Sequence, residues 1–183
     1  MAAIAALCAS SLDGWITAGV YKFASALTTS GAIAVPAYDE LMIIVRVVSL
    51  STSDVPALRF NADAGNNYRC RYVVNNALSG TTLTDGPDPS VSVAELSFMS
   101  STLSRVVLAV VNNKLAASKV GTVVSAIGSG SAASQQKIDI AGSIEWANTT
   151  AQITSVELRT FGGTATFGID SGMAVLGKDP PES

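Results

Sequence analysis

The densest group of polar side chains in the sequence lies at residues 61–68, which read NADAGNNY. Alternating oxygen-bearing side chains around a glycine are typical of the start of a calcium-binding loop. An EF-hand loop places a carboxylate at its twelfth position, which is Tyr72 here. Asp, Asn and Gly are also the residues of tight hairpin connections, where they adopt left-handed conformations and form local hydrogen bonds. We therefore favour a turn over a calcium site, and we expect no bound metal and no cofactor.

The residue types of common catalytic sites are absent or scattered. The chain has no histidine, which excludes Ser–His–Asp and Cys–His catalysis and histidine metal sites. Its 14 acidic residues are spread along the chain, and the closest groups, at 39–40 and 85–88, fall in expected loops. Glycosidase chemistry needs two carboxyl groups roughly 5–10 Å apart, and no local pattern selects such a pair. No phosphate-binding glycine motif or G-x-S-x-G motif occurs. We expect no enzymatic activity.

Three arginines are candidates for contact with a partner. Arg59, Arg69 and Arg71 lie on neighbouring expected strands, and Arg46 is a further candidate for the same group. Arginine pairs with carboxylates through two parallel hydrogen bonds, so such a group could bind an acidic surface. The same arginines also fit the solvent-facing side of an ordinary sheet. Trp15 and Trp146 could likewise stack on sugars, although buried aromatic side chains are the more common use in a sandwich.

The charge and the apolar content of the chain exclude further classes of partner. Of 183 residues, 48% are hydrophobic and only 14% are charged, with a net charge of −3. A chain of this charge has no basic footprint for nucleic acid. No run reaches about 18 apolar residues, so we expect no membrane-spanning helix. Cys8 and Cys70 do not have zinc-site spacing, and we favour two separate thiols over a disulfide.

Apolar segments separated by Gly, Pro, Ser, Thr, Asn and Asp indicate an all-β fold with about nine or ten short strands. This pattern is typical of an antiparallel β-sandwich or jelly roll. Residues 41–48 are so continuously apolar that we expect a central strand buried on both faces, or a strand in the interior of a sheet. Residues 79–90 are expected to be a turn-rich loop, and 96–103 is a weak helix candidate. The expected strands lie within 14–23, 41–48, 57–61, 68–74, 91–98, 105–111, 121–127, 137–140, 155–160, 167–169 and 173–177.

No repeat and no change of composition marks a linker, so we expect a single sandwich domain over residues 14–177. Residues 1–13 are apolar and contain no Lys or Arg, unlike the positively charged start of a signal peptide. We expect them to form an uncleaved apolar arm or a lead-in to the first strand. Residues 178–183 are expected to be a polar tail.

Two parts of the chain together resemble a family of small β-sandwich virion proteins of tailed bacteriophages. The first is YDELMIIVR at 38–46 followed by LRFNADAGNNY at 58–68. The second is ITSVELR at 153–159 followed by FGG at 161–163 and a last strand segment at 168–177. In the family, a Y-x-x-L-x-I strand precedes an L-R-F-N-x-D-x-G-x-N-Y hairpin. A late I-T-S-I-x-L strand then precedes a glycine-rich turn and the final strand.

The resemblance implies a structural protein of the virion, with no catalytic residues to transfer. The expected role is a capsid decoration (cement) protein that binds the major capsid protein or other virion subunits as a homotrimer and stabilises the head lattice. The alternative is a tail- or fibre-associated module that recognises host glycans. A non-viral carbohydrate-binding module is a third possibility. Contact with nucleic acid or with a membrane is not expected.

Overall fold

The computed structural model describes residues 14–76, 80–84, 92–96, 104–127 and 138–179. Within these ranges the chain forms strands, and no helix has the length and hydropathy of a membrane span. The strands are β1 (Ile16–Lys22), β2 (Thr29–Ala34), β3 (Glu40–Val47), β4 (Pro56–Phe60), β5 (Tyr68–Asn76), β6 (Gly80–Thr84), β7 (Ala94–Glu95), β8 (Arg105–Asn112), β9 (Lys119–Ile127), β10 (Ile138–Trp146), β11 (Ser155–Thr160) and β12 (Gly172–Lys178).

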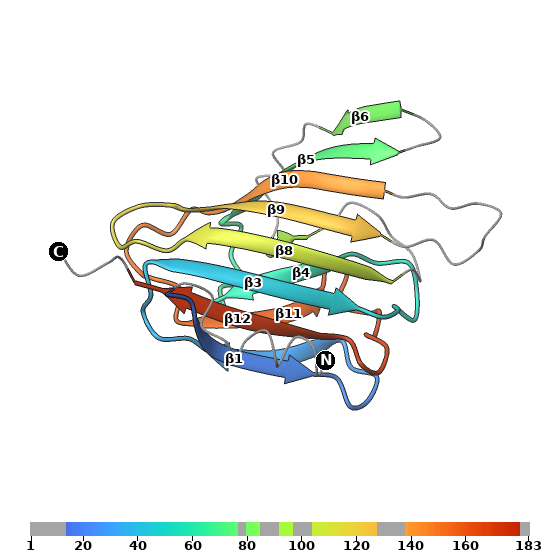
Figure 1. Cartoon of the computed structure of the whole chain (residues 1–183), viewed down its shortest axis with the longest axis horizontal. Coiled ribbons are helices and arrows are strands. Elements are labelled where there is room, and N and C mark those ends of the chain that lie inside the picture. Colours follow the sequence, from blue (N-terminus) through green and yellow to red (C-terminus); the bar gives the residue numbers. More distant parts are fainter. Residues whose placement is uncertain (1–13, 77–79, 85–91, 97–103, 128–137, 180–183) are drawn as a thin grey trace.

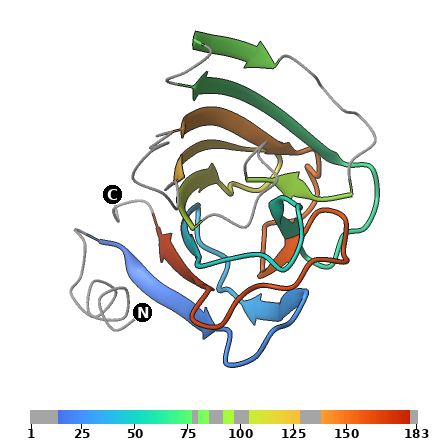
Figure 2. The ribbon, with the colours of Figure 1, turned by 90° about the vertical axis from the view of Figure 1, so that its right-hand side faces the viewer.

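These strands form two antiparallel sheets that pack as a sandwich. The large sheet has eight strands in the order β1-β12-β3-β8-β9-β10-β5-β6, and the small sheet has four in the order β2-β11-β4-β7. The pairs β1–β12, β2–β11, β3–β8 and β4–β7 nest inside one another and alternate between the sheets. This is jelly-roll-like pairing. The large sheet faces the viewer in Figure 1 with β4 and β11 behind it, and Figure 2 shows it curving around the small sheet.

Alternation of side chains places one face of each strand in the core. In β8, residues 105, 107, 109 and 111 are buried, whereas 106, 108 and 112 are exposed. In β11, Val156 and Leu158 are buried between the sheets as the sequence predicts. In β5, Tyr68, Cys70 and Tyr72 are buried and the intervening arginines are exposed, as the two-residue period of a strand requires.

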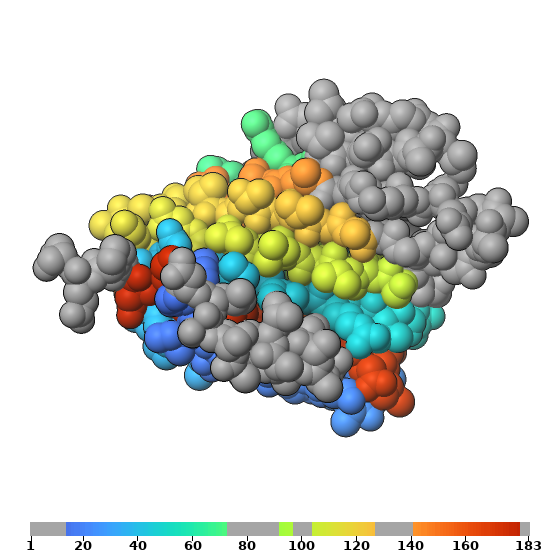
Figure 3. Space-filling view, in the orientation of Figure 1, coloured from blue at the N-terminus to red at the C-terminus, as the bar shows by residue number. Residues whose placement is uncertain are grey.

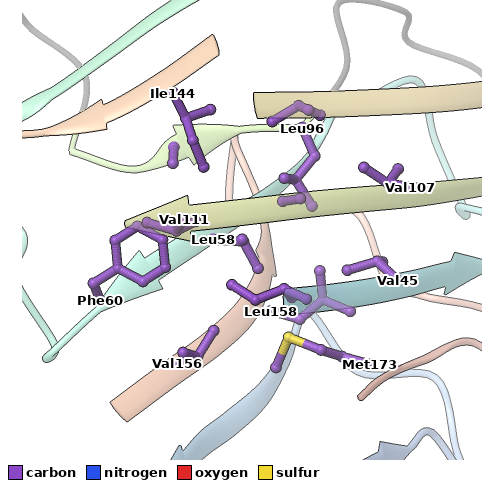
Figure 4. Close-up of a cluster of buried hydrophobic side chains, with 14 of the residues drawn as sticks. Val45, Leu58, Phe60, Leu96, Val107, Val111, Ile144, Val156, Leu158 and Met173 are labelled. Carbon is purple, nitrogen blue, oxygen red and sulfur yellow. The ribbon is translucent and has the colours of Figure 1, made fainter. Parts of the chain in front are cut away.

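The core lies between the small sheet and the inner face of the large sheet. Phe60, Val156 and Leu158 of the small sheet meet Val45, Val107, Val111 and Ile144 of the large one, as Figure 4 shows. Trp146, at the end of β10, is 1% exposed and lies 6.0 Å from the Phe60 ring centroid. This indole therefore belongs to the core and is not available for stacking on a sugar.

The all-β antiparallel prediction is confirmed, and several local expectations are corrected. β2 forms at 29–34, between the first two expected strands, and β6 forms at 80–84, inside the expected loop, as the last strand of the large sheet. An edge strand tolerates turn-rich neighbours because only one of its sides is paired. The segment 167–169 forms only isolated bridges through Phe167. Leu96 lies in a bend, and the rest of the helix candidate, 97–103, lies outside the described residues.

The prediction that both faces of residues 41–48 are buried is only half right. The inner residues of β3, such as Ile43, are fully buried, but the outer residues Met42, Ile44 and Arg46 are only half-buried. The small sheet covers one face of the large sheet, and that geometry is not encoded in the apolar run itself. The expected arm at 1–13 and Cys8 lie outside the described residues, while Cys70 is a buried thiol.

Two asparagine side chains bind the loop between β10 and β11, where the chain passes from the large sheet to the small one. Asn113 follows β8 and is completely buried. Its Nδ2 donates to the carbonyl oxygens of Tyr38 at 2.8 Å and Ile153 at 3.2 Å, and its Oδ1 accepts from the Ile153 N–H at 2.5 Å. Asn61, after β4, donates from Nδ2 to Gln152 O at 2.8 Å, and its Oδ1 accepts from Thr154 N–H at 2.8 Å. The loop between β10 and β11 is therefore bonded to a residue from each sheet.

Replacing Asn113 with alanine should destabilise the fold. Asn113→Ala leaves buried backbone groups of Ile153 and Tyr38 without partners, which should lower the free energy of unfolding by about 1–3 kcal/mol. Urea denaturation measures this change. The matched control is Asn112→Ala, because Asn112 is an exposed neighbour that accepts only the Lys114 N–H among the hydrogen bonds described. A loss in the control as large as in Asn113→Ala would contradict the role assigned to Asn113.

Candidate functional site

The polar loop at 61–68 is a turn that joins β4 of the small sheet to β5 of the large sheet. Asn61 and Ala62 have positive φ values of 52° and 55°, so the chain reverses through left-handed conformations. The Asp63 carboxylate then accepts three hydrogen bonds: from Gly65 N–H at 2.8 Å, Asn67 Nδ2 at 2.9 Å and Trp146 Nε1 at 2.7 Å. The predicted turn is confirmed, although it connects two sheets and is not a hairpin within one.

These hydrogen bonds set the ionisation of Asp63. Burial by itself opposes the charged form, but the bonds from Trp146, Asn67 and Gly65 outweigh it and lower the pKa of Asp63 below its usual value. The carboxylate is thus already used to hold the turn against the end of β10. Among the described residues, no group of three or more Cys, Asp or Glu side chains is arranged to hold a metal ion.

The structure divides the predicted arginine group. Arg69 and Arg71 are exposed on the outer face of β5, but Arg59 lies on β4 in the other sheet, opposite Glu157 of β11. Arg46 is on the outer face of β3, with β8, β9 and β10 between it and β5. The expectation of one cluster of three is therefore corrected, because β4 and β5 are consecutive in sequence but belong to different sheets. Whether any of these arginines contacts a partner stays a prediction.

Arg69 and Arg71 line a hollow on the outer face of the large sheet. The hollow has a volume of about 560 Å³, and its lining includes Val120 of β9 and Ser143 and Glu145 of β10. Arg69 Nη1 lies 3.3 Å from Glu145 Oε2, and both groups are partly exposed. We call this feature the arginine hollow. The two arginines are among the residues predicted from the sequence, whereas Ser143 and Glu145 are not. These two residues are more than 70 positions away in the chain and reach the site only through β5–β10 pairing.

Beside the arginine hollow, the outer face of β8 and β9 is apolar and open. Figure 3 shows this face, with β8 and β9 crossing its middle. Leu108 pairs with Val124 across the two strands. We call this group the apolar strip; its members, with their exposed fractions, are Val106 (52%), Leu108 (39%), Val120 (52%) and Val124 (52%). The sequence carried a signal for it, since both faces of 105–111 and 119–124 contain valine or leucine.

Two cations point inward from these same strands, which the sequence analysis did not identify. Lys119 is fully buried, and its Nζ donates to the carbonyl oxygens of Ala117 at 2.5 Å and Asn148 at 3.0 Å. Burial lowers the pKa of Lys119 below its usual value. Burial also lowers the pKa of Arg105, to about 10.

The second tryptophan, Trp15, lies under Lys178, whose Nζ is 6.0 Å from the ring centroid.

Comparisons with known proteins give weak structural likeness only. No protein-family model matches the chain, and no curated protein matches its sequence. One solved structure with some likeness is the PL-14 alginate lyase from the marine Aplysia kurodai, with 10% identity, a TM-score of 0.26 and coverage of 78% of this chain and 69% of that one. Another is the CBM2 module of the evolved Dit of Lactobacillus casei BL23 phage J-1. It has 10% identity, a TM-score of 0.16 and coverage of 81% of this chain and 70% of that one.

The first neighbour is an enzyme, so the expectation of no enzymatic activity is corrected and is not kept as a conclusion. That expectation depended on missing local motifs, and carboxyl groups that meet across loops leave no such motif. A TM-score of 0.26 assigns no reaction and no catalytic residue to this chain. The second neighbour comes from a phage, and a TM-score of 0.16 assigns no family and no role to this chain.

The Asp63 carboxylate should make stability depend on pH. Because its pKa is lowered on folding, its contribution is complete above the unfolded pKa of about 4 and is lost as pH falls through the lower folded value. Asp63→Asn should therefore cost about 1.5–3 kcal/mol at pH 7 and less at pH 3. Urea denaturation at the two pH values measures the difference.

The control for this prediction is Glu40→Gln, which removes one exposed carboxylate at the start of β3. It corrects for the change in net charge. If Asp63→Asn cost no more than Glu40→Gln at pH 7, or cost the same at both pH values, the role assigned to the Asp63 carboxylate would be wrong.

Proposed function

We propose that this chain is a bacteriophage virion protein that decorates the capsid and stabilises the head lattice through its apolar strip. The observation that carries the proposal is the exposure of Val106, Leu108 and Val124 side by side on β8 and β9, with Val120 further along β9 beyond Thr122. Contiguous exposed apolar surface is unusual on a monomeric protein and marks an interaction site. The proposed occupant of the strip is the major capsid protein, and the proposed place of the protein is the virion.

The shape of the strip fits attachment to a repeated surface. The strip lies on the central strands of a sheet, so backbone hydrogen bonds on both sides hold its side chains in place. A rigid apolar surface loses little conformational freedom on binding. A standard interface buries only about 800 Å² per partner, and a lattice multiplies the effect of each contact through avidity. Attachment as a homotrimer at a threefold position of the lattice would add further contacts, and this is part of the proposal.

A second function, a tail- or fibre-associated module that recognises host glycans, is favoured by the arginine hollow. The hollow offers charged and hydroxyl groups beside an apolar side chain, a mixture that suits a polar ligand. The two functions differ in what a virion lacking the protein would lose, namely head stability in one case and adsorption to the host in the other.

Changing the strip should therefore weaken attachment to heads. Purified heads that lack the protein are mixed with wild type, Val124→Lys or Leu108→Lys, and bound protein is measured by co-sedimentation. A buried lysine without a partner opposes docking, so we expect at least tenfold weaker attachment for both variants. Heads with wild-type protein should also survive heating that disrupts bare heads, and heads mixed with the variants should not.

Ile169→Lys is the matched control, because Ile169 is an apolar residue that is even more exposed, at 59%, and lies outside the strip, in the loop before β12. It should attach like wild type. Equal attachment of all three variants would contradict docking by the strip. Heads that stay equally heat-resistant without the protein, together with lost adsorption of particles to cells, would overturn the decoration role in favour of host recognition.

A further inference from the structure

The arginine hollow combines two cross-strand pairs of unlike chemistry. Arg69 of β5 is the register partner of Glu145 of β10, and Arg71 is the register partner of Ser143. On the far side of β10, Val120 of β9 is the register partner of Glu145. These side chains line one hollow of about 560 Å³. The hollow is therefore cationic along β5, polar along β10 and apolar along β9.

We propose that the arginine hollow binds a saccharide that carries a carboxylate, such as a uronic acid unit. A guanidinium group binds a carboxylate through two parallel hydrogen bonds. Arg69 and Arg71 lie two residues apart on the same face of β5, so their Cα atoms are separated by about 7 Å. Two guanidinium groups at this spacing can reach one carboxylate and a neighbouring ring substituent from the same side.

Glu145 distinguishes a saccharide from other anions. A carboxylate accepts hydrogen bonds and donates none. A phosphate ion or a chain of acidic side chains would bring acceptors and negative charge against it. A sugar ring brings hydroxyl groups, which donate to a carboxylate such as Glu145 and exchange hydrogen bonds with the Ser143 hydroxyl. The contact between Arg69 and Glu145 at 3.3 Å is partly exposed, and such ion pairs cost little to rearrange.

The remaining contacts fit a ring of this kind. Val120 is 52% exposed and offers an apolar surface on which the C–H groups of a sugar ring can pack. The volume of the hollow, about 560 Å³, lies within the range of about 300–1,000 Å³ that is usual for small-ligand sites. The site shares only Val120 with the apolar strip. The inference rests on the second proposed function, glycan recognition, and names its ligand class; it does not depend on capsid decoration.

Calorimetric titration of the full-length protein tests the proposal with defined probes. Trigalacturonate supplies carboxylates and hydroxyls, its fully methyl-esterified form supplies hydroxyls without charge, and triglutamate supplies carboxylates without sugar hydroxyls. We expect saturable binding of trigalacturonate at low salt and at least tenfold weaker binding of the other two. Raising the salt concentration should weaken the binding, because the site is exposed to solvent.

Variants locate the site. Arg69→Ala and Arg71→Ala should each weaken trigalacturonate binding at least fivefold with only a small change in the thermal midpoint, because both side chains are exposed and exposed ion pairs such as Arg69–Glu145 contribute little to stability. Arg46→Ala is the matched control, since it removes one cation from the same sheet face outside the hollow. It should bind like wild type.

Three results would overturn the inference. If trigalacturonate shows no saturable binding, or if its methyl ester binds equally well, the hollow does not recognise a sugar carboxylate. Equal binding of triglutamate would make the hollow a contact for an acidic protein segment. An equal loss in Arg46→Ala would show non-specific attraction to the whole face. None of these results bears on attachment to heads, so failure of this proposal and failure of the decoration proposal are distinguishable.

Discussion

The crossing from β10 to β11 is the connection on which the two sheets depend. Asn113 comes from the large sheet and Asn61 from the end of a small-sheet strand, and both bond the backbone between residues 152 and 155. Lys119 of β9 adds a bond to the carbonyl oxygen of Asn148 at the start of the same loop. A buried backbone segment without such partners would cost free energy at each unpaired group. These side chains supply the partners and thereby determine how the loop enters the small sheet.

The Asp63 turn belongs to the same end of the sandwich and reinforces this connection. Trp146 ends β10, packs on Phe60 and donates its indole N–H to Asp63. Tyr68 begins β5, and its hydroxyl exchanges hydrogen bonds with the backbone of Phe60. One end of β5 and one end of β10 are thereby held to β4. Since β5 and β10 carry the arginine hollow on their outer face, the polar contacts beneath the sheet position the side chains above it.

The unequal size of the sheets explains why a functional surface exists. Four strands cover the inner face of eight, and the outer face of β8, β9, β10 and β5 presents side chains that no described strand covers. The apolar strip and the arginine hollow lie next to each other on that face. The backbone of Leu108 and Val124 is paired with strands on both sides, whereas Arg69 and Arg71 are paired with β10 alone, because β6 pairs with β5 only from Tyr72 onward. Side chains on this outer face can be changed by substitution without loss of the core.

The sequence by itself determined the all-β class and the face that each strong strand buries. Residues 68–72 and 155–160 show the two-residue period plainly, and Asn, Asp and Gly at 61–67 predict the turn. Period alone does not determine which strands pair. Arg59 and Arg69 are ten residues apart yet lie in different sheets, whereas Arg69 meets Glu145 across 76 residues of chain. Only the tertiary structure decided these neighbours, because strand pairing is a long-range choice made by the packing of the whole core.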